Sequence, residues 1–387
     1  MTTAYWLLAL FLGIILYVWV VYPLLVFVLA FLFPFRRGSS ERRYERKSER
    51  TSDPSVTIII AVHNEQQKIA AKLGDCLDLL YPRDRLDILV ASDGSTDRTE
   101  EIVRRFAADD SRIQWLQNES RLGKSGVQNL AAQQARGELL FFTDANTAMT
   151  PGVLRTMIDN LSDPAVGLVT ATVLFGHPED AVEKGQGFYW RFELFLRGAE
   201  SRLGILATGS GQALLVRREL FQTLPTCYGD DCILPLDVRL QGYKVIQDPE
   251  ATVYDAMPHS IEGELRTRIR MTARNWTGTL ARPALLNPLR FPLTALGLLS
   301  HKLLRWLTPF FMAAIFLSNT FLAIQGRFIL LWWLQTGFYF SALVGWLLTR
   351  RQRPAWVFGY PFSFCLANVG FLLGMVKALR NQKIVAY

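Results

Sequence analysis

Cysteine and histidine are scarce in this sequence, with four residues of each among 387. The cysteines are not paired at the short spacings of zinc sites, and the histidines are scattered along the chain. We therefore expect free thiols and structural histidines, and no zinc centre or disulfide framework. The residues concerned are Cys76, Cys227, Cys232, Cys365, His63, His177, His259 and His301.

Two further absences narrow the class of function. No Gly-x-Gly-x-x-Gly pattern follows the first β-branched run, Val56–Val62, which argues against a dinucleotide-dependent oxidoreductase. The net charge is +8, but the basic residues concentrate beside long apolar runs rather than on one soluble face. We therefore expect membrane lipid, and not nucleic acid, as the anionic partner.

Charged residues are absent from residues 2–35, a run longer than the roughly 20 apolar residues that cross a bilayer. A cleavable signal is disfavoured because the run is too long and no basic residue precedes it. The sequence predicts a membrane span here and three more in the last third of the chain, which makes four. The three later apolar stretches are residues 303–324, 328–348 and 356–376.

The segment after the first apolar run is basic. Residues 36–54 contain seven Lys or Arg and four Asp or Glu, so the positive-inside rule places this segment in the cytoplasm. It is either a solvated linker or a helix near anionic headgroups. Four crossings put the far end of the chain outside, whereas Lys377, Arg380 and Lys383 favour the inside, so three and four crossings both stay open.

Between residues 54 and 280, short β-branched runs alternate with amphipathic segments, which is the pattern of an α/β domain with a mostly parallel sheet. Such a sheet binds ligands outside the carboxyl ends of its strands. The strands are expected at residues 56–62, 86–92, 112–116, 138–143 and 166–173, and the helices at residues 65–80, 96–108 and 124–136.

Polar residues follow three of these strands. His63-Asn64-Glu65 follows the first, residues 92–97 follow the second, and Asp144-Ala145-Asn146 follows the fourth. A nucleotide sugar needs hydrogen-bond partners for its base and ribose, and its diphosphate needs a divalent cation with oxygen ligands. Each motif alone fits ordinary turn or helix-cap chemistry, but three at successive strand ends predict a ligand site.

Three clusters lie further along the chain. Residues 208–212, Thr-Gly-Ser-Gly-Gln, allow close backbone approach to a ligand, although a plain turn into a strand explains them equally well. Asp230 and Asp231 begin an expected helix, either as partners of its dipole or with one of them as a general base. Arg266, Arg268, Arg270 and Arg274, followed by Asn275 and Trp276, fit either a diphosphate or a membrane surface.

Taken in order, these motifs resemble the family-2 inverting glycosyltransferases, especially the membrane-integrated branch of cellulose, hyaluronan and poly-N-acetylglucosamine synthases. The resemblance covers residues 54–280 and implies a GT-A fold, a nucleotide-sugar donor, usually a UDP-sugar, and Mg²⁺ or Mn²⁺. It implies Asp231 as the catalytic base and Asp144 with Asn146 as the metal ligands. The expected donor-binding residues are Asn64, Glu65, Asp93, Lys124, Asp144 and Arg274, and the expected acceptor-binding residues are Gly209, Ser210, Gly211, Asp230 and Trp276.

The sequence departs from the family pattern at three places. Ser92 replaces the first acid of the Asp-Asp-Gly motif, and Asn146 stands where the second Asp of the metal motif is usual. An Asn carbonyl can bind a cation without contributing charge, so we expect metal binding to be retained but weaker. The Gln-x-x-Arg-Trp signature of processive enzymes is altered, because no Gln is in place and Asn275 separates Arg274 from Trp276. Processivity therefore does not follow from the resemblance.

The expected organisation is a membrane helix at residues 1–35, a basic cytoplasmic linker at 36–53, a GT-A glycosyltransferase domain at 54–280, and an interfacial helix with about three membrane helices at 281–387. This layout predicts an integral protein of the cell inner or plasma membrane with a cytoplasmic catalytic domain. The spans imply a lipid-linked acceptor or a saccharide product that crosses the bilayer, in exopolysaccharide or envelope glycan synthesis. An inactive membrane scaffold or transport protein is the competing class, because of Ser92 and Asn146.

Overall fold

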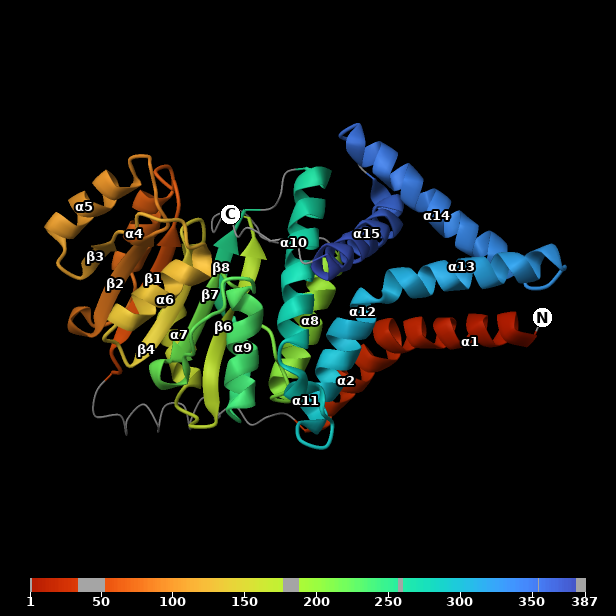
Figure 1. Cartoon of the computed structure of the whole chain (residues 1–387), viewed down its shortest axis with the longest axis horizontal. Helices are drawn as coiled ribbons and strands as arrows, with labels where there is room; N and C mark the ends of the chain where they lie inside the picture. Colours follow the sequence, from red (N-terminus) through yellow and green to blue (C-terminus); the bar gives the residue numbers. More distant parts are fainter. Residues whose placement is uncertain (1, 34–52, 177–187, 257–259, 354, 381–387) are drawn as a thin grey trace.

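The computed structural model describes residues 2–33, 53–176, 188–256, 260–353 and 355–380. Figure 1 shows an α/β domain at one end of the molecule and a group of long helices that project from the other end. Two helices, α8 (Phe188–Arg202) and α10 (Ile261–Leu280), lie between these two parts. Most of the basic segment, the tail with Lys383, and two internal segments that contain His177 and His259 fall outside the described residues.

The sheet has eight strands in the order β3-β2-β1-β4-β7-β6-β8-β5. Strands β1 to β4 pair in parallel, as do β6 and β8, whereas β7 runs antiparallel to both β4 and β6. The prediction of a mostly parallel sheet is therefore confirmed. The strands are β1 (Val56–Val62), β2 (Leu86–Ser92), β3 (Ile113–Leu116), β4 (Leu139–Asp144), β5 (Ala148–Met149), β6 (Val166–Phe175), β7 (Ala213–Arg217) and β8 (Lys244–Asp255).

Strand β1 is apolar along its length because helices cover both faces of the sheet. Ile58 and Ile60 pack toward one helix layer and Ile59 packs toward the other, and all three are fully buried. Truncating a buried Ile to Ala typically costs about 2–5 kcal/mol. One layer contains α4 (Ile69–Leu77), α5 (Thr99–Asp109) and α7 (Val153–Asn160), and the other contains α6 (Lys124–Gln134) and α9 (Asp230–Leu240).

Two helices begin later than expected, because hydrogen bonds hold the preceding residues in a turn. Helix α4 begins at Ile69 instead of residue 65, after a turn in which Lys68 N donates to Glu65 O. Helix α5 begins at Thr99, since Asp97 accepts from the backbone N of Thr99. Among the described residues there are four short 3₁₀ helices, η2 (Arg83–Arg85), η4 (Arg218–Leu220), η5 (Pro283–Leu286) and η7 (Trp356–Phe358).

Two of the described helices are long and apolar enough to cross a membrane, and a bent pair raises the number to three if the pair is one span. The first candidate, residues 2–32, consists of α1 (Thr2–Leu16), η1 (Tyr17–Val21) and α2 (Tyr22–Leu32), where η1 is π-helical. The second is α15 (Gly359–Leu379). The bent pair joins Pro292–Trp306 to α13 (Thr308–Ile324) at an angle of 56°.

Helix α14 (Ile329–Arg350) has 22 residues but is not among the apolar candidates, because polar residues such as Gln335 lower its hydropathy. The number of crossings therefore stays a prediction. The expected interfacial helix before α13 consists of three short elements, α11 (Pro292–Gly297), η6 (Leu298–Leu303) and α12 (Leu304–Trp306), of which η6 is π-helical. All four cysteines are free, as expected.

Candidate active site

The three polar strand ends meet at one edge of the sheet. Strand register places Val62 opposite Ser92 and Ala61 opposite Asp144. The residues that follow β1, β2 and β4 are therefore neighbours, because the carboxyl ends of parallel strands lie at the same edge. The end of β8 reaches the same place, since Asn146 Nδ2 donates to Asp255 Oδ1 at 2.9 Å.

Hydrogen bonds join the loops after β1 and β2. Asn64 adopts a positive φ of 56°, a conformation that Asn tolerates better than most residues. Its Oδ1 accepts from Thr96 N at 2.8 Å, and its own backbone N donates to Ser95 Oγ at 3.1 Å. The backbone N of Glu65 donates to Thr99 Oγ1 at 2.9 Å. Asn64 and Glu65 are therefore held in fixed positions beside the second motif.

Asp93 is fully buried and binds backbone amides. Its Oδ1 accepts from Leu122 N at 2.6 Å, and both of its carboxylate oxygens lie 3.1 Å from Gly123 N. Gly123 has a φ of +77°, which favours glycine over residues with a side chain. In the structure Asp93 thus fixes the turn that precedes α6 and positions Lys124, the first residue of that helix. Its expected contact with a donor base stays a prediction.

Lys124 connects two of the expected site acids. Its Nζ lies 2.6 Å from Asp144 Oδ1 and 2.9 Å from Asp230 Oδ2. Burial lowers the pKa of Lys124, but the two carboxylates outweigh this effect and raise it, so the ammonium is charged. Gln128, one turn further along α6, donates Nε2 to Asp230 Oδ2 at 2.9 Å. Sequence reasoning missed Gln128, although its spacing of four from Lys124 places both residues on one helix face.

Asp230 and Asp231 differ in their electrostatic environment. Burial raises the pKa of Asp230, but Lys124 and Arg274 reverse this effect and hold it below its usual value. Burial and then the charge of Asp230 raise the pKa of Asp231, against the opposing effects of Arg274, Lys124 and Arg197. Two adjacent carboxyl groups with pKa values moved in opposite directions are typical of an acid–base site, in which one group serves as base.

Arg274 lies beside this acidic pair. Its Nη2 donates to Tyr228 O at 2.7 Å, and its Nε is buried without a hydrogen-bond partner among the described residues. Trp276, two residues after Arg274, packs edge-on against Trp306 with ring centroids 6.0 Å apart. Both rings belong to a cluster that includes Phe371 of α15. The structure therefore brings Arg274 to the acidic pair and packs Trp276 against the C-terminal helices.

The loop before β7 passes close to the acids. A Cβ on Gly211 would lie 3.5 Å from both Asp230 Oδ1 and Lys124 Nζ, so the backbone at Gly211 approaches the lysine and its partner closely. The backbone N of Gly209 donates to Asp231 O at 2.8 Å. Ser210 N donates to Thr170 Oγ1 at 2.9 Å, and its hydroxyl accepts from Arg197 Nη1 at 3.1 Å.

Asp255 is a site acid that sequence reasoning missed. It accepts from Asn146 and also from Gln212 Nε2, the latter at 3.0 Å. Burial raises the pKa of Asp255, the hydrogen bonds from Gln212 and Ala256 oppose this effect, and the charge of Asp144 adds to it. The position of Asp255 at the end of β8 was the available signal. Within the described ranges, no three His, Cys, Asp or Glu side chains form a ready metal site.

A family model described as glycosyl transferase family 2 matches residues 57–224. An N-acetylglucosaminyltransferase of Mesorhizobium japonicum is 26% identical over 259 residues, which cover 62% of this chain and 60% of the relative. An N-acetylglucosaminyltransferase of Rhizobium meliloti is 26% identical over 249 residues, which cover 60% of this chain and 58% of the relative. The chain thus spans about three fifths of the length of these relatives.

A solved structure resembles the chain over almost its whole length. It is the mannosyltransferase PcManGT from Pyrobaculum calidifontis in complex with GDP-Man and Mn²⁺. The TM-score is 0.72 at 22% sequence identity, and the match covers 97% of this chain and 99% of that one. The similarity therefore extends beyond the α/β domain to the long helices at both ends of the sequence.

Proposed function

The chain is a family-2 glycosyltransferase whose catalytic domain has the GT-A fold, and from this premise we propose that it acts at the cytoplasmic face of a membrane. It moves a sugar from a nucleotide-diphospho-sugar, a UDP-sugar, to a lipid-linked or saccharide acceptor in exopolysaccharide or envelope glycan synthesis. The observation that carries this proposal is the convergence of Lys124, Asp144, Asp231 and Arg274 at the carboxyl edge of the sheet.

Asp231 is the proposed catalytic base. Its raised pKa and its position beside Arg274 suit a group that accepts a proton from an acceptor hydroxyl. The acceptor oxygen then bonds to the anomeric carbon as the bond from that carbon to the diphosphate oxygen breaks, which inverts the configuration. The nucleoside diphosphate leaves with the bonding electrons, and Arg274 and Lys124 are the cations placed to stabilise its charge.

The residues at the edge of the sheet fit a divalent cation. Asp144 has a side chain that is 27% exposed, and it offers carboxylate oxygen, the ligand type that Mg²⁺ and Mn²⁺ prefer. Asn146 keeps its carbonyl oxygen available because its Nδ2 makes the contact with Asp255. Two side chains suffice when substrate phosphates supply further ligands. When bound, the cation supplies Lewis-acid stabilisation of the leaving diphosphate.

The names of the similar proteins support a sugar nucleotide of the hexose class. Those with matching sequences are N-acetylglucosaminyltransferases, and the structural match was solved with GDP-Man and Mn²⁺. We favour an N-acetylhexosaminyl or hexosyl group carried by UDP. A single transfer to a lipid-linked acceptor is favoured over processive polymerisation, because Trp276 packs against Trp306 instead of facing the acidic pair.

Release of nucleoside diphosphate by the full chain tests this function in nanodiscs made from membrane lipid extract, which supplies lipid-linked acceptors for the sugar. UDP-N-acetylglucosamine, UDP-glucose and GDP-mannose are each supplied with Mn²⁺. We expect release from one UDP-sugar, which stops with chelator and falls at least about 10²-fold in Asp231→Asn, while donor binding persists. Asp109→Asn, an exposed acid at the end of α5, is the matched control and should keep full activity. No release from any donor would support the inactive scaffold instead.

A further inference from the structure

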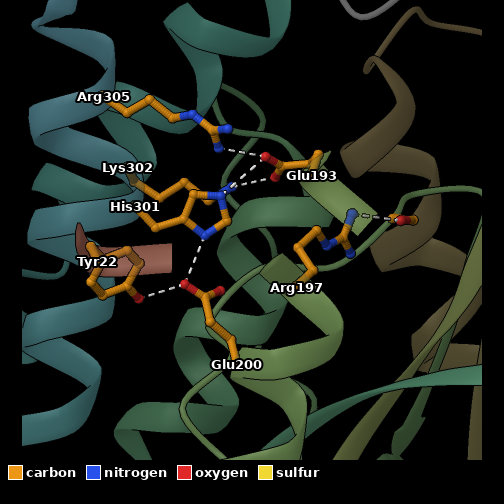
Figure 2. Close-up of polar contacts among 8 residues, drawn as sticks. Tyr22, Glu193, Arg197, Glu200, His301, Lys302 and Arg305 are labelled. Atoms are coloured by element: carbon orange, nitrogen blue, oxygen red, sulfur yellow. Dashed lines mark hydrogen bonds and ion pairs between the residues drawn. The ribbon is translucent and has the colours of Figure 1, made fainter. Parts of the chain in front are cut away.

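A buried polar cluster joins the catalytic domain to the membrane-associated helices. Figure 2 shows side chains from α8, α2, η6 and α12 that point toward one another. All but Lys302 are at most 7% exposed. We call it the junction cluster, and its members are Tyr22, Glu193, Arg197, Glu200, His301, Lys302 and Arg305.

Two carboxylates of α8 bind the helices that follow and precede the catalytic domain. Glu193 contacts His301 Nε2 at 3.1 Å, Lys302 Nζ at 3.1 Å and Arg305 Nη1 at 2.6 Å. Burial opposes ionisation of Glu193, but Lys302, His301 and Arg305 hold its pKa well below the usual value. Glu193 is therefore an ionised group whose oxygens already have partners.

Glu200, two turns further along α8, is engaged in the same way. Its Oε1 accepts from Tyr22 OH at 2.7 Å and lies 2.8 Å from His301 Nδ1. One histidine thus links both carboxylates, and a tyrosine of the first membrane candidate completes the set. These contacts explain why neither carboxylate forms an ion pair with Arg197, which lies between them on the same helix.

Arg197 has unused hydrogen-bonding capacity. It is 4% exposed, and only its Nη1 has a partner, the hydroxyl of Ser210 at 3.1 Å. Its Nε and Nη2 are buried and donate to no acceptor in the part of the chain that the structure describes. A buried guanidinium left partly unpaired is costly, and these two atoms form the edge that binds an oxyanion with two parallel hydrogen bonds.

The charge of the junction cluster also favours an anion. Counting both carboxylates as ionised, Arg197, Lys302 and Arg305 give three positive charges against two negative ones, an excess of one. In Figure 2 the guanidinium of Arg197 points away from His301 toward the hydroxyl that it binds. That hydroxyl belongs to the loop beside Asp231, and the charge of Arg197 acts on the carboxyl group of Asp231.

We propose that the Nε and Nη2 edge of Arg197 binds a phosphate oxyanion of the acceptor, supplied by a phosphate-linked lipid. Arg197 lies on the membrane side of Asp231, because Glu200 on the same helix accepts from Tyr22 OH of the first apolar helix and contacts His301 of the segment before α13. Lys124 and Arg274, which are placed for the donor diphosphate, do not belong to it. The assignment rests on the proposed transferase function and specifies the acceptor of that same site.

Binding measurements on the full chain in phosphatidylcholine nanodiscs test the assignment without requiring turnover. The probes are a C55 polyprenyl phosphate, the matching polyprenol, inorganic phosphate and UDP with Mn²⁺. The variants are Arg197→Gln, Arg197→Lys and, as matched control, Arg202→Gln, an exposed arginine on the same helix. The dissociation constants are followed by tryptophan fluorescence.

We expect wild type and Arg202→Gln to bind polyprenyl phosphate at least about tenfold more tightly than polyprenol. Arg197→Gln should lose this preference by about ten- to hundred-fold, and Arg197→Lys should restore part of it. Weakened UDP binding with unchanged lipid binding would overturn the proposal, because Arg197 would then serve the donor. Equal dissociation constants for inorganic phosphate and polyprenyl phosphate would contradict the proposal that the bound phosphate belongs to a lipid.

A purely structural role would also overturn the proposal, and it would appear as a lower melting temperature in Arg197→Gln with an unchanged preference for phosphate. Failure of the transferase function is distinguishable, because it is measured as the absence of donor turnover in wild type. A wild-type chain that binds polyprenyl phosphate selectively but turns over no donor would therefore contradict the function and leave the lipid phosphate site supported.

Discussion

The Nζ atom of Lys124 lies 2.6 Å from Oδ1 of Asp144. In the chain without donor, the ammonium group therefore neutralises the carboxylate that is proposed to bind the cation. Helix α6 and the end of β4 are joined by this contact, and the lysine is in turn held by the turn that Asp93 fixes. Binding of a divalent cation at Asp144 must compete with this ion pair.

Removing the competing ammonium should tighten binding of the metal alone. In Lys124→Met, Asp144 and Asp230 lose their shared partner, so we expect Mn²⁺ to bind about tenfold more tightly in the absence of donor. Donor turnover should fall, because a cation for the diphosphate is lost. Titration of Mn²⁺ by electron paramagnetic resonance measures the first effect. Unchanged or weaker Mn²⁺ binding would contradict the competition.

Restoring the second acid of the metal motif should have two opposite effects. In Asn146→Asp, an added carboxylate should strengthen Mn²⁺ binding by about tenfold. The new carboxylate lies beside Asp255, because Asn146 donates to Asp255 at 2.9 Å in the wild type. Without metal, repulsion between two like charges therefore replaces this hydrogen bond. We expect a lower melting temperature in chelator and a larger stabilisation by Mn²⁺ than in wild type. Equal melting temperatures in both conditions would argue against a metal role for residue 146.

The pH dependence of the rate should move when Asp230 is neutralised. Asp231 must be ionised to act as a base. Burial raises its pKa most and the charge of Asp230 raises it further, whereas Arg274, Lys124 and Arg197 lower it. In Asp230→Asn the raising charge is gone, so the pKa of Asp231 falls and the acid limb of the pH–rate profile moves to lower pH. Initial rates between about pH 4 and 8 measure this.

The overall rate of Asp230→Asn should also fall, because Lys124 loses one of its two partners. A drop in rate alone is therefore uninformative, and the position of the acid limb is the diagnostic quantity. Asp109→Asn should show the wild-type profile. An acid limb that stays in place or moves to higher pH in Asp230→Asn would rule out Asp231 as the titrating base.

A reporter fused after Tyr387 should be cytoplasmic. Helix α15 packs along α10, where Cβ atoms on Gly370 and Gly374 would come within 3 Å of Arg268 and Thr272 side chains. Helix α15 is apolar enough to cross a membrane and α14 is not among those candidates. We nevertheless expect the docking of α15 on α10 to hold it at the membrane surface, so that α14 makes the crossing. The crossings are then the first helix, α13 and α14, which places Arg350, Arg351 and Arg353 inside, as the positive-inside rule requires. Periplasmic reporter activity would indicate four crossings.

The sheet was predictable because its signal is local. The β-branched runs at Val56–Val62 and Leu86–Ser92 have the bounds expected from the sequence, and parallel pairing then brings the polar strand ends together. Asp144 was identified for the same reason, whereas Asp230 was identified from its place at the start of an expected helix and from the family resemblance. Their shared contact with Lys124 followed only from the three-dimensional arrangement.

The junction cluster could not be predicted, because its contacts join residues about a hundred positions apart. Glu193 and His301 are 108 residues apart, and each reads separately as an ordinary polar residue of a helix. Asp255 was missed because β8 runs for 12 residues and its acid looks like a surface residue. Trp276 was assigned from a family motif, and its packing against Trp306 could not be predicted because the two residues are far apart in the sequence. Its contact with an acceptor stays a prediction.

Helix α8 carries contacts to both sides of the molecule. Glu200 holds the first apolar helix through Tyr22, and Arg197, less than one turn away, holds the loop beside Asp231 through Ser210. A tilt of the first helix therefore acts on the acceptor side of the active site through one rigid element. The thickness of the bilayer influences the tilt of a membrane helix, so we expect the rate of this enzyme to differ between membranes of different acyl-chain length.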